Sequence, residues 1–180
     1  LPAVYGPGDK QHRLFPYIKR MDDQRPAILA DAGMVNWRWT RGYVENVAAA
    51  ISWAAGDQNP SSGIYNVGEE KALPEKEWIA RIGEVIGWQG RVLAVDPSDL
   101  PEKMRSALRW QHNLETDTST IHAQPGFSEP VEFQEGILRT VEWERANPPA
   151  INPQDFDYET EDRVLQKFGE SRILSATPGE

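Results

Sequence analysis

The chain opens with the segment Leu1-Pro2-Ala3-Val4-Tyr5-Gly6-Pro7-Gly8-Asp9. The residues before Gly6 are apolar, which predicts the end of a buried strand that the chain enters midway. The glycines and the proline that follow Tyr5 predict a tight turn at the end of this strand. Because no Met precedes Leu1, we expect the chain to be a fragment of a longer protein.

Helical and strand patterns alternate in the sequence that follows this segment. Apolar residues at helical spacing predict helices over residues 11–23, 43–55, 74–86 and 131–146. Short apolar or alternating runs predict strands over residues 27–30, 34–40, 64–68 and 91–95. The helix at 43–55 is expected to turn toward the core an apolar stripe of Val44, Val47, Ala48, Ile51 and Ala55. This alternation indicates the α/β class.

A change of composition after Pro149 divides the chain. We predict one α/β domain over residues 1–149 and an acidic C-terminal tail over residues 150–180, with a short helix near 159–168. The tail could dock a partner or fold back on the domain. Its apolar residues are Leu165, Phe168 and Ile173.

Composition excludes several classes of function. The net charge is -9 and the pI about 4.9, with no run of Lys or Arg, so nucleic acid is not an expected partner. There is no Cys, and His12, His112 and His122 lack metal-ligand spacing, so we predict no metal site and exposed histidines. No apolar run approaches the roughly 20 residues of a membrane span, and we expect a cytoplasmic protein.

Three ordered groups of residues are similar to the second half of the extended short-chain dehydrogenases, the NAD-dependent epimerase/dehydratases. The first is the opening segment, and the second is Arg41-Gly42-Tyr43-Val44-Glu45-Asn46-Val47-Ala48-Ala49-Ala50-Ile51 followed by Tyr65-Asn66-Val67-Gly68. The third comprises Asp117-Thr118-Ser119, Pro125-Gly126-Phe127 and Thr140-Val141-Glu142-Trp143. The resemblance implies that residues 1–149 are the C-terminal, substrate-side portion of a Rossmann-type fold.

In this family a preceding Rossmann half carries a Gly-rich dinucleotide loop and a catalytic Tyr-x-x-x-Lys pair. Neither pattern occurs in this chain; Tyr5, for example, is followed four residues later by Asp9. The resemblance therefore implies NAD or NADP in an intact parent, no cofactor bound by this fragment, no catalytic residue here, and a missing N-terminal half as partner. The alternative is a non-catalytic binding or interaction module that kept the fold.

The resemblance also implies residues that contact ligands. Pro2, Ala3 and Val4 would lie beside the nicotinamide, unless they are simply strand and turn. The small-molecule substrate would be contacted by Gln11, His12, Arg41 and Arg109, of which His12 and Arg41 could instead be surface residues. Many nucleotide-sugar enzymes of the family hold the substrate with an Asn where this chain has Ala3, whose side chain cannot form a hydrogen bond. The resemblance therefore argues against a typical nucleotide sugar. The expected substrate is a sugar derivative or another small hydroxy or carbonyl compound.

Aromatic residues and strand edges leave further alternatives. Trp37 and Trp39 could form a stacking platform for a ligand, although alternate positions on a strand favour core packing. Trp78 and Trp143 are expected in the core. The strands at 3–5 and 64–67 would pair with the missing half, so we expect self-association through these edges or an altered path of the first residues.

Overall fold

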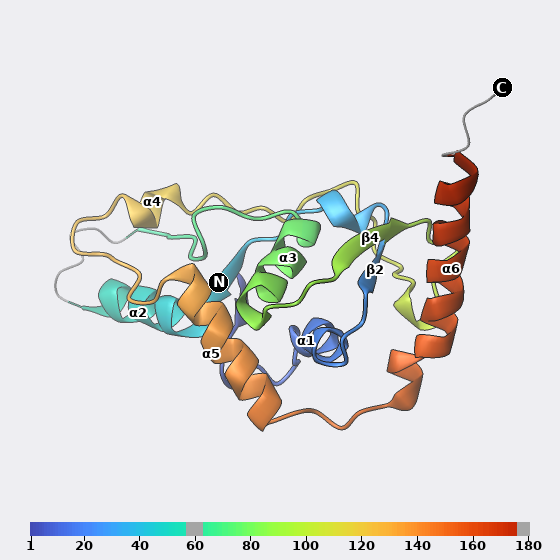
Figure 1. The fold of residues 1–180 in the computed structure, drawn as a ribbon. Helices are drawn as coiled ribbons and strands as arrows, with labels where there is room; N and C mark the ends of the chain where they lie inside the picture. The colour runs from blue at the N-terminus through green and yellow to red at the C-terminus, as the bar shows by residue number, and fades with distance from the viewer. Residues whose placement is uncertain (57–62, 176–180) are drawn as a thin grey trace.

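The computed structural model describes the backbone of residues 1–56 and 63–175, and the side chains of these residues as far as Phe168 (Figure 1). The α/β class is confirmed. The elements are β1 (Ala3–Tyr5), α1 (Phe15–Asp22), β2 (Ala27–Asp31), η1 (Met34–Asn36), β3 (Arg41–Tyr43), α2 (Val44–Ala55), α3 (Glu75–Ile86), β4 (Arg91–Val95), η2 (Glu102–Met104), α4 (Ser119–His122), α5 (Phe133–Ala146), η3 (Pro153–Phe156) and α6 (Tyr158–Ser175), where η denotes a 3-10 helix.

Within the described ranges, the strands form two parallel pairs. β1 pairs with β3, so that Ala3 lies opposite Arg41. β2 pairs with β4, so that Ala27 lies opposite Arg91. Because parallel strands end at the same edge, the loop after β1 and the start of α2, which follow the two strands of the first pair, lie together.

The main core lies around α3, which packs against α1 and α5 (Figure 1). Trp78 and Ile79 of α3 are buried together with Tyr5 of β1 and Ile18 of α1. The Tyr5 and Trp78 rings meet edge to face at a centroid distance of 5.0 Å. The prediction that Trp78 belongs to the core is therefore confirmed.

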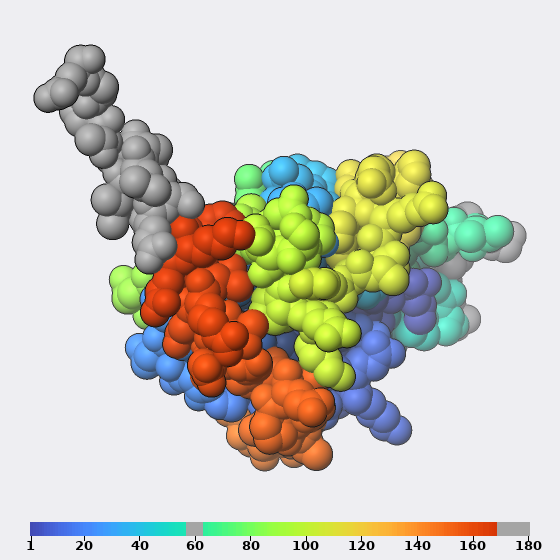
Figure 2. Space-filling view, turned by 90° about the vertical axis from the view of Figure 1, so that its right-hand side faces the viewer, coloured from blue at the N-terminus to red at the C-terminus, as the bar shows by residue number. Residues whose placement is uncertain are grey.

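The C-terminal tail folds back on the β2–β4 pair. Val164 of α6 is buried in a second apolar cluster with Leu29 of β2 and Val95 of β4, and Leu165 and Phe168 pack against that cluster. Figure 2 shows α6 covering this face of the molecule beside the segment that follows β4. The tail helix runs well beyond the predicted 159–168, and the side chain of Ile173 lies outside the described residues.

Two predicted strands are wrong. Over residues 34–40 the chain forms η1 and then an extended segment with isolated bridges from Arg38 to Pro74 and from Trp39 to Leu114. The Asp31 carboxylate accepts the Gly33 N–H at 2.8 Å, which bends the chain before a strand can begin. Residues 64–68 form no strand, because in the described part of the chain no second strand lies beside them to complete a ladder.

The predicted helices at 43–55, 74–86 and 131–146 are confirmed, but the buried face of α2 is not the predicted one. α2 buries Asn46, Val47 and Ala50, while Ala48, Ile51 and Ala55 are exposed. Asn46 is buried because its side-chain amide donates to the Val131 carbonyl at 2.8 Å and its oxygen accepts the Val131 N–H at 3.0 Å. Ala48, Ile51 and Ala55 therefore form an exposed stripe on α2 that has no cover among the described residues.

A buried ion pair joins the tail to α1. The Arg20 guanidinium donates to Glu161 Oε1 at 3.1 and 2.7 Å, and it also donates to the Asp155 carbonyl at 2.9 Å. Both side chains are almost inaccessible to solvent. Glu161 also forms a longer ion pair with Arg25, whose Nε lies 4.0 Å from Glu161 Oε2, so Arg20 is its nearer partner and not its sole one among the described residues.

We predict that Arg20→Ala lowers the free energy of unfolding by about 3 kcal/mol, because it leaves the buried Glu161 carboxylate with only the longer ion pair to Arg25, whose Nε lies 4.0 Å from Glu161 Oε2. The matched control is Arg163→Ala, which removes an exposed ion pair with Glu159 and should change stability by less than about 0.5 kcal/mol. Urea denaturation measures both. An equal loss of unfolding free energy in the two variants would contradict the assignment of a stabilising buried ion pair to Arg20 and Glu161.

Candidate functional site

Two cavities adjoin at the loop that follows β1. The larger cavity, of about 530 Å³, lies between α1, β2, η2 and the start of the tail. The smaller cavity, of about 280 Å³, lies between α1, β1, β3 and the start of α3. Gln11 and Tyr17 line both cavities. The two cavities therefore form one candidate ligand site.

The loop over residues 6–13 is held in place by its own hydrogen bonds and by a close approach. Gly6 has a φ of +131°, and a Cβ at this position would lie 2.6 Å from Val44 Cγ1 of α2, so glycine is required there. The Asp9 carboxylate accepts the Gln11 N–H at 3.1 Å and the Arg13 N–H at 3.2 Å. These bonds place Gln11 at the junction of the cavities.

The smaller cavity is built around a buried carboxylate. Glu75, the first residue of α3, accepts the Arg41 Nη2–H at 2.5 Å and the Tyr17 hydroxyl at 3.0 Å. Burial raises the pKa of Tyr17, and the neighbouring Glu75 charge raises it further. Arg41 lies in β3, and its guanidinium carbon lies 4.4 Å from the centre of the Trp78 ring. Arg41 is thus an internal side chain at the cavity wall, not a surface charge.

Trp37 and Trp39 have different roles. Trp37 is buried and donates its indole N–H to the His112 carbonyl at 2.7 Å, as core packing predicts. Trp39 is half-buried and lines the smaller cavity, with its ring 5.3 Å from the Arg41 guanidinium carbon. Only this second tryptophan has the position of a stacking platform.

His12 lies at the edge of the larger cavity and is fixed on two sides. Its Nδ1 lies 2.6 Å from Glu144 Oε2, and its ring stacks on Trp143 at 5.3 Å. Glu144 is fully buried, and this burial raises the pKa of its carboxyl. His12 also has a φ of +49°, which a non-glycine residue seldom adopts. His12, which was expected to be exposed, is therefore half-buried and held in one orientation. Trp143, which was expected in the core, is half-buried beside it.

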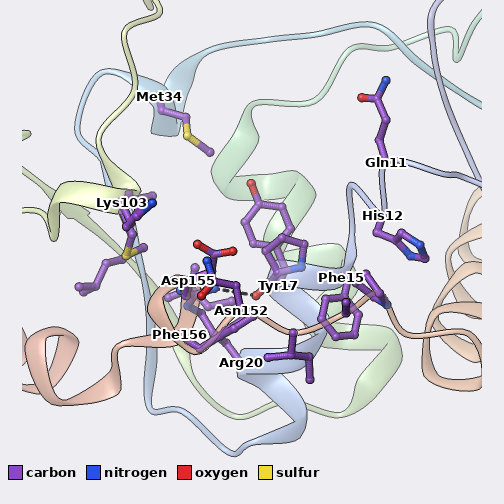
Figure 3. Close-up of a pocket in the computed structure, with 18 of the residues that line it drawn as sticks. Gln11, His12, Phe15, Tyr17, Arg20, Met34, Lys103, Asn152, Asp155 and Phe156 are labelled. Atoms are coloured by element: carbon purple, nitrogen blue, oxygen red, sulfur yellow. Dashed lines mark hydrogen bonds between the residues drawn. The ribbon is translucent and has the colours of Figure 1, made fainter.

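Figure 3 shows how the larger cavity is arranged. Gln11 and His12 lie on one side, and Met34 and Lys103 lie on the other. Its walls are largely apolar, and Phe156 of η3 meets Phe15 of α1 edge to face at 6.2 Å. The tail thus supplies one wall of a ligand-sized cavity.

The residues predicted to lie beside the nicotinamide occupy both faces of β1. Ala3 lines the smaller cavity, whereas Pro2 and Val4 line a groove of about 400 Å³ next to the loop. The Val4 carbonyl accepts the Arg13 Nη1–H at 3.0 Å. This arginine therefore caps the outer edge of β1.

The other candidates lie apart from the two cavities. Arg109 is exposed, as is His112. His122 is half-buried, with its Nε2 3.0 Å from the Gly68 carbonyl. Among the side chains that the structure describes, no three acidic or histidine groups gather as metal ligands. In the described part of the chain, no helix is both long and apolar enough to span a bilayer.

Sequence reasoning missed Tyr17, Glu75 and Glu144. Glu75 follows a proline at the predicted start of a helix, where a carboxylate is common for reasons of the helix dipole alone. Glu144 and Tyr17 lie on helices that we predicted, but nothing local distinguishes them. Their partners lie far away in sequence, so only the tertiary structure identifies them.

Glu69 is a further titratable group near the site. Burial raises the pKa of its carboxyl to about 7, although the Tyr5 hydroxyl and the Arg41 charge both act to lower it. Between its unfolded pKa, near 4.5, and about 7, the folded state thus binds a proton that the unfolded state has released. The contribution of Glu69 to stability therefore falls as the pH rises through this window.

We predict that Glu69→Gln abolishes this loss. Relative to the parent chain, the variant should gain about 1–3 kcal/mol in the free energy of unfolding between about pH 5 and pH 8, since one pKa unit corresponds to about 1.4 kcal/mol. Urea denaturation across this pH range measures the gain. The exposed neighbour provides the control variant Glu70→Gln. If the stabilities of Glu69→Gln and the parent chain changed with pH in parallel, the raised pKa assigned to Glu69 would be wrong.

Comparison with known proteins gives no match to a protein-family model and no match to a curated protein. In structure the chain is similar to the UDP-glucose 4-epimerase of Thermus thermophilus in complex with NAD (TM-score 0.54, 25% identity, covering 80% of this chain and 44% of that chain). It is also similar to MoeE5 in complex with UDP-glucose and NAD (0.57, 18%, 82% and 46%). A third similar structure is DesIV, a dTDP-glucose 4,6-dehydratase from Streptomyces venezuelae with NAD bound (0.55, 22%, 85% and 44%).

The chain spans less than half the length of these enzymes. It therefore shares its fold with a part of the Rossmann-type, NAD-dependent sugar epimerases and dehydratases.

Proposed function

We propose that this chain is the C-terminal, substrate-side part of an NAD(P)-dependent epimerase, dehydratase or reductase that acts on a sugar-derived or other small hydroxy or carbonyl substrate. One observation carries the proposal: Ala3, Gln11 and Arg41, predicted from separate segments, line one cavity. The fold that holds this cavity is shared with part of enzymes whose structures contain NAD and nucleotide sugars.

In this proposal the chain binds and orients the substrate, and the proton-transfer groups come from an N-terminal half. Gln11 at the junction and the oriented His12 would contact polar groups of the substrate, and Arg41 would contact it in the smaller cavity. Arg109, which is exposed, would contact it from outside the cavities. The chain alone is then inactive, because the sequence holds no Tyr-x-x-x-Lys pair.

The residues of this chain predicted to lie beside the nicotinamide have few free backbone groups with which to bind a cofactor. Pro2 has no backbone N–H, and the Val4 carbonyl already accepts a hydrogen bond from Arg13. NAD or NADP would supply hydride transfer in the whole enzyme. We propose that the missing half binds most of the cofactor and that the groove beside Pro2 and Val4 meets one end of it.

The exposed stripe of α2 supports the proposed partner half. Ala48 and Ala55 are exposed, and Ile51 retains 51% of its accessible surface. A helix whose apolar residues face outward is normally covered by another element. We propose that the N-terminal half covers this stripe, and we expect self-association of the chain in its absence.

A non-catalytic binding module is the second candidate. The capping of β1 by Arg13 and the return of α6 onto the β2–β4 pair both favour it, because the chain covers some of its own open surfaces. The two candidates differ in whether the longer protein binds a dinucleotide.

We predict that the protein encoded by the complete reading frame binds NAD or NADP with a micromolar Kd, whereas residues 1–180 alone bind at least about 100-fold more weakly. Isothermal titration calorimetry with each dinucleotide measures both. A complete protein without affinity for either dinucleotide would reject the enzyme proposal and favour the binding module.

We also predict opposite outcomes for Ile51→Ser in the two proteins. In this chain the exposed side chain contributes little, so stability should change by less than about 0.5 kcal/mol. In the complete protein Ile51→Ser should lower the free energy of unfolding by about 1–3 kcal/mol, because Ile51 is then buried. Chemical denaturation of both proteins provides the comparison, and an unchanged stability of the complete protein would show that the stripe is not its interface.

A further inference from the structure

Asp31 is a buried carboxylate without a cationic partner. It is the last residue of β2 and retains 6% of its accessible surface. With the residues that the structure describes it forms no ion pair, and its one side-chain hydrogen bond runs from the Gly33 N–H to Oδ1. The second oxygen, Oδ2, accepts no hydrogen bond from them and is not closed off from solvent. A buried charge of this kind destabilises the folded chain unless a partner reaches it.

This carboxylate belongs to the wall of the larger cavity. Asp31 lies where β2 ends beside its parallel partner β4, opposite Val95. In α/β folds the carboxyl ends of parallel strands commonly hold the ligand site. The volume of the cavity, about 530 Å³, is that of a small-molecule pocket. Asp31 therefore presents its free oxygen where a ligand can reach it.

The other walls of the larger cavity suit an apolar body next to a positive charge. Phe15, Tyr17 and Phe156 contribute aromatic rings, which Figure 3 shows between the Lys103 side and the His12 side of the cavity. The faces of such rings attract cations as well as apolar groups. These walls would hold the body of a ligand whose charged end reaches Asp31.

The cationic side chains of the cavity do not neutralise Asp31. Arg20 donates to Glu161 through Nε at 3.1 Å and through Nη2 at 2.7 Å, so its charge is already paired. Lys10 and Lys103 are exposed, and salt screens exposed charges over about 10 Å. An anionic ligand group would therefore meet a buried negative charge and no buried free cation.

We propose that the larger cavity binds a small ligand that carries a protonated amino group, which donates to Asp31 Oδ2, and an apolar body, which lies against the aromatic walls. An ammonium group is a compact charge with three donors, so it can neutralise the carboxylate and still donate to water or to a neighbouring carbonyl. The inference goes beyond the proposed function, because it assigns Asp31 and these walls to a class of ligand that differs from the hydroxy or carbonyl substrate.

Phenethylamine, 2-phenylethanol and phenylacetate form a matched set of probes. They share a phenyl ring on a short chain, and at neutral pH they carry a cation, a neutral hydroxyl and an anion. The sequence has three methionines, whose methyl groups can be labelled for NMR. Met34 and Met104 line the cavity, whereas Met21 is fully buried in the main core and serves as the internal reference. Met34→Leu and Met104→Leu assign the signals.

We expect phenethylamine to shift the Met34 and Met104 signals of the 180-residue chain with a millimolar Kd and to leave the Met21 signal unchanged. 2-Phenylethanol should bind at least about threefold more weakly, and phenylacetate at least about tenfold more weakly, because neither neutralises Asp31. Binding of either compound as tight as that of phenethylamine would overturn the proposal, and so would no binding of phenethylamine.

Asp31→Asn tests the cause, because it removes the charge and keeps an oxygen for the Gly33 N–H. Phenethylamine should bind this variant about tenfold more weakly, and 2-phenylethanol should bind it within about twofold of the parent chain. The control is Asp155→Asn, since Asp155 lines the same cavity but is exposed, and it should weaken phenethylamine by less than about twofold. Equal losses of affinity in both variants would reject Asp31 as the amine partner. If Asp31→Asn does not fold, the three probes on the parent chain still decide the proposal.

Lys103→Met tests whether the chain provides the cation itself, because the long side chain of Lys103 lies at this cavity. We expect the affinity for phenethylamine to change by less than about threefold. Phenethylamine that bound only to this variant would show that Lys103 occupies the place of the ligand, and the proposal would fail.

The outcomes are independent of the proposed function. If phenethylamine binds as expected while the complete protein binds no dinucleotide, the amine site is supported and the enzyme proposal fails. If the complete protein binds NAD or NADP while phenethylamine does not shift the Met34 and Met104 signals, the amine site is wrong and the enzyme proposal stands.

Discussion

The buried carboxylate of Glu75 links the parts of the structure on which the candidate site depends. Its backbone N–H donates to the Trp37 carbonyl at 2.9 Å, so the start of α3 is tied to the segment after η1. Its side chain accepts from Arg41 of β3 and from Tyr17 of α1. A charge buried this deeply is stable only with hydrogen-bonding partners in place. The same contacts that stabilise Glu75 therefore set the distance between the walls of the smaller cavity.

The sequence was sufficient for those features that repeat locally. Apolar residues at helical spacing identified α2, α3 and α5, and the strand before Gly6 was recognised from its turn. The burial of α2 was predicted with the wrong face, because Asn46 is buried through a pair of hydrogen bonds to Val131, which lies 85 residues away. A hydrophobic pattern shows which residues of a helix could be buried. The element that packs against the helix determines which of these residues are buried.

The site was predictable in part for a similar reason. Ala3, Gln11 and Arg41 were identified from their places in family-like segments, and all three line the smaller cavity. Tyr17, Glu75 and Glu144 were missed because each acts through a distant residue. The fold tolerates wide changes in sequence as long as the apolar pattern persists, whereas ligand chemistry depends on individual side chains. Likeness in fold therefore says less about the substrate than Arg41 and its surroundings do.

The ion pair between Arg20 and Glu161 has a consequence for how the chain is made. The two residues lie 141 positions apart, and Arg20 belongs to the helix that also carries Tyr17. A ribosome adds about 5–20 residues per second, so α1 is synthesised several seconds before the helix that neutralises its buried arginine. During this interval Arg20 remains in water and the β2–β4 pair lacks its outer cover. The tail helix thus supplies the charge partner of a helix that was made long before it. The larger cavity acquires its final wall only after the tail has left the ribosome.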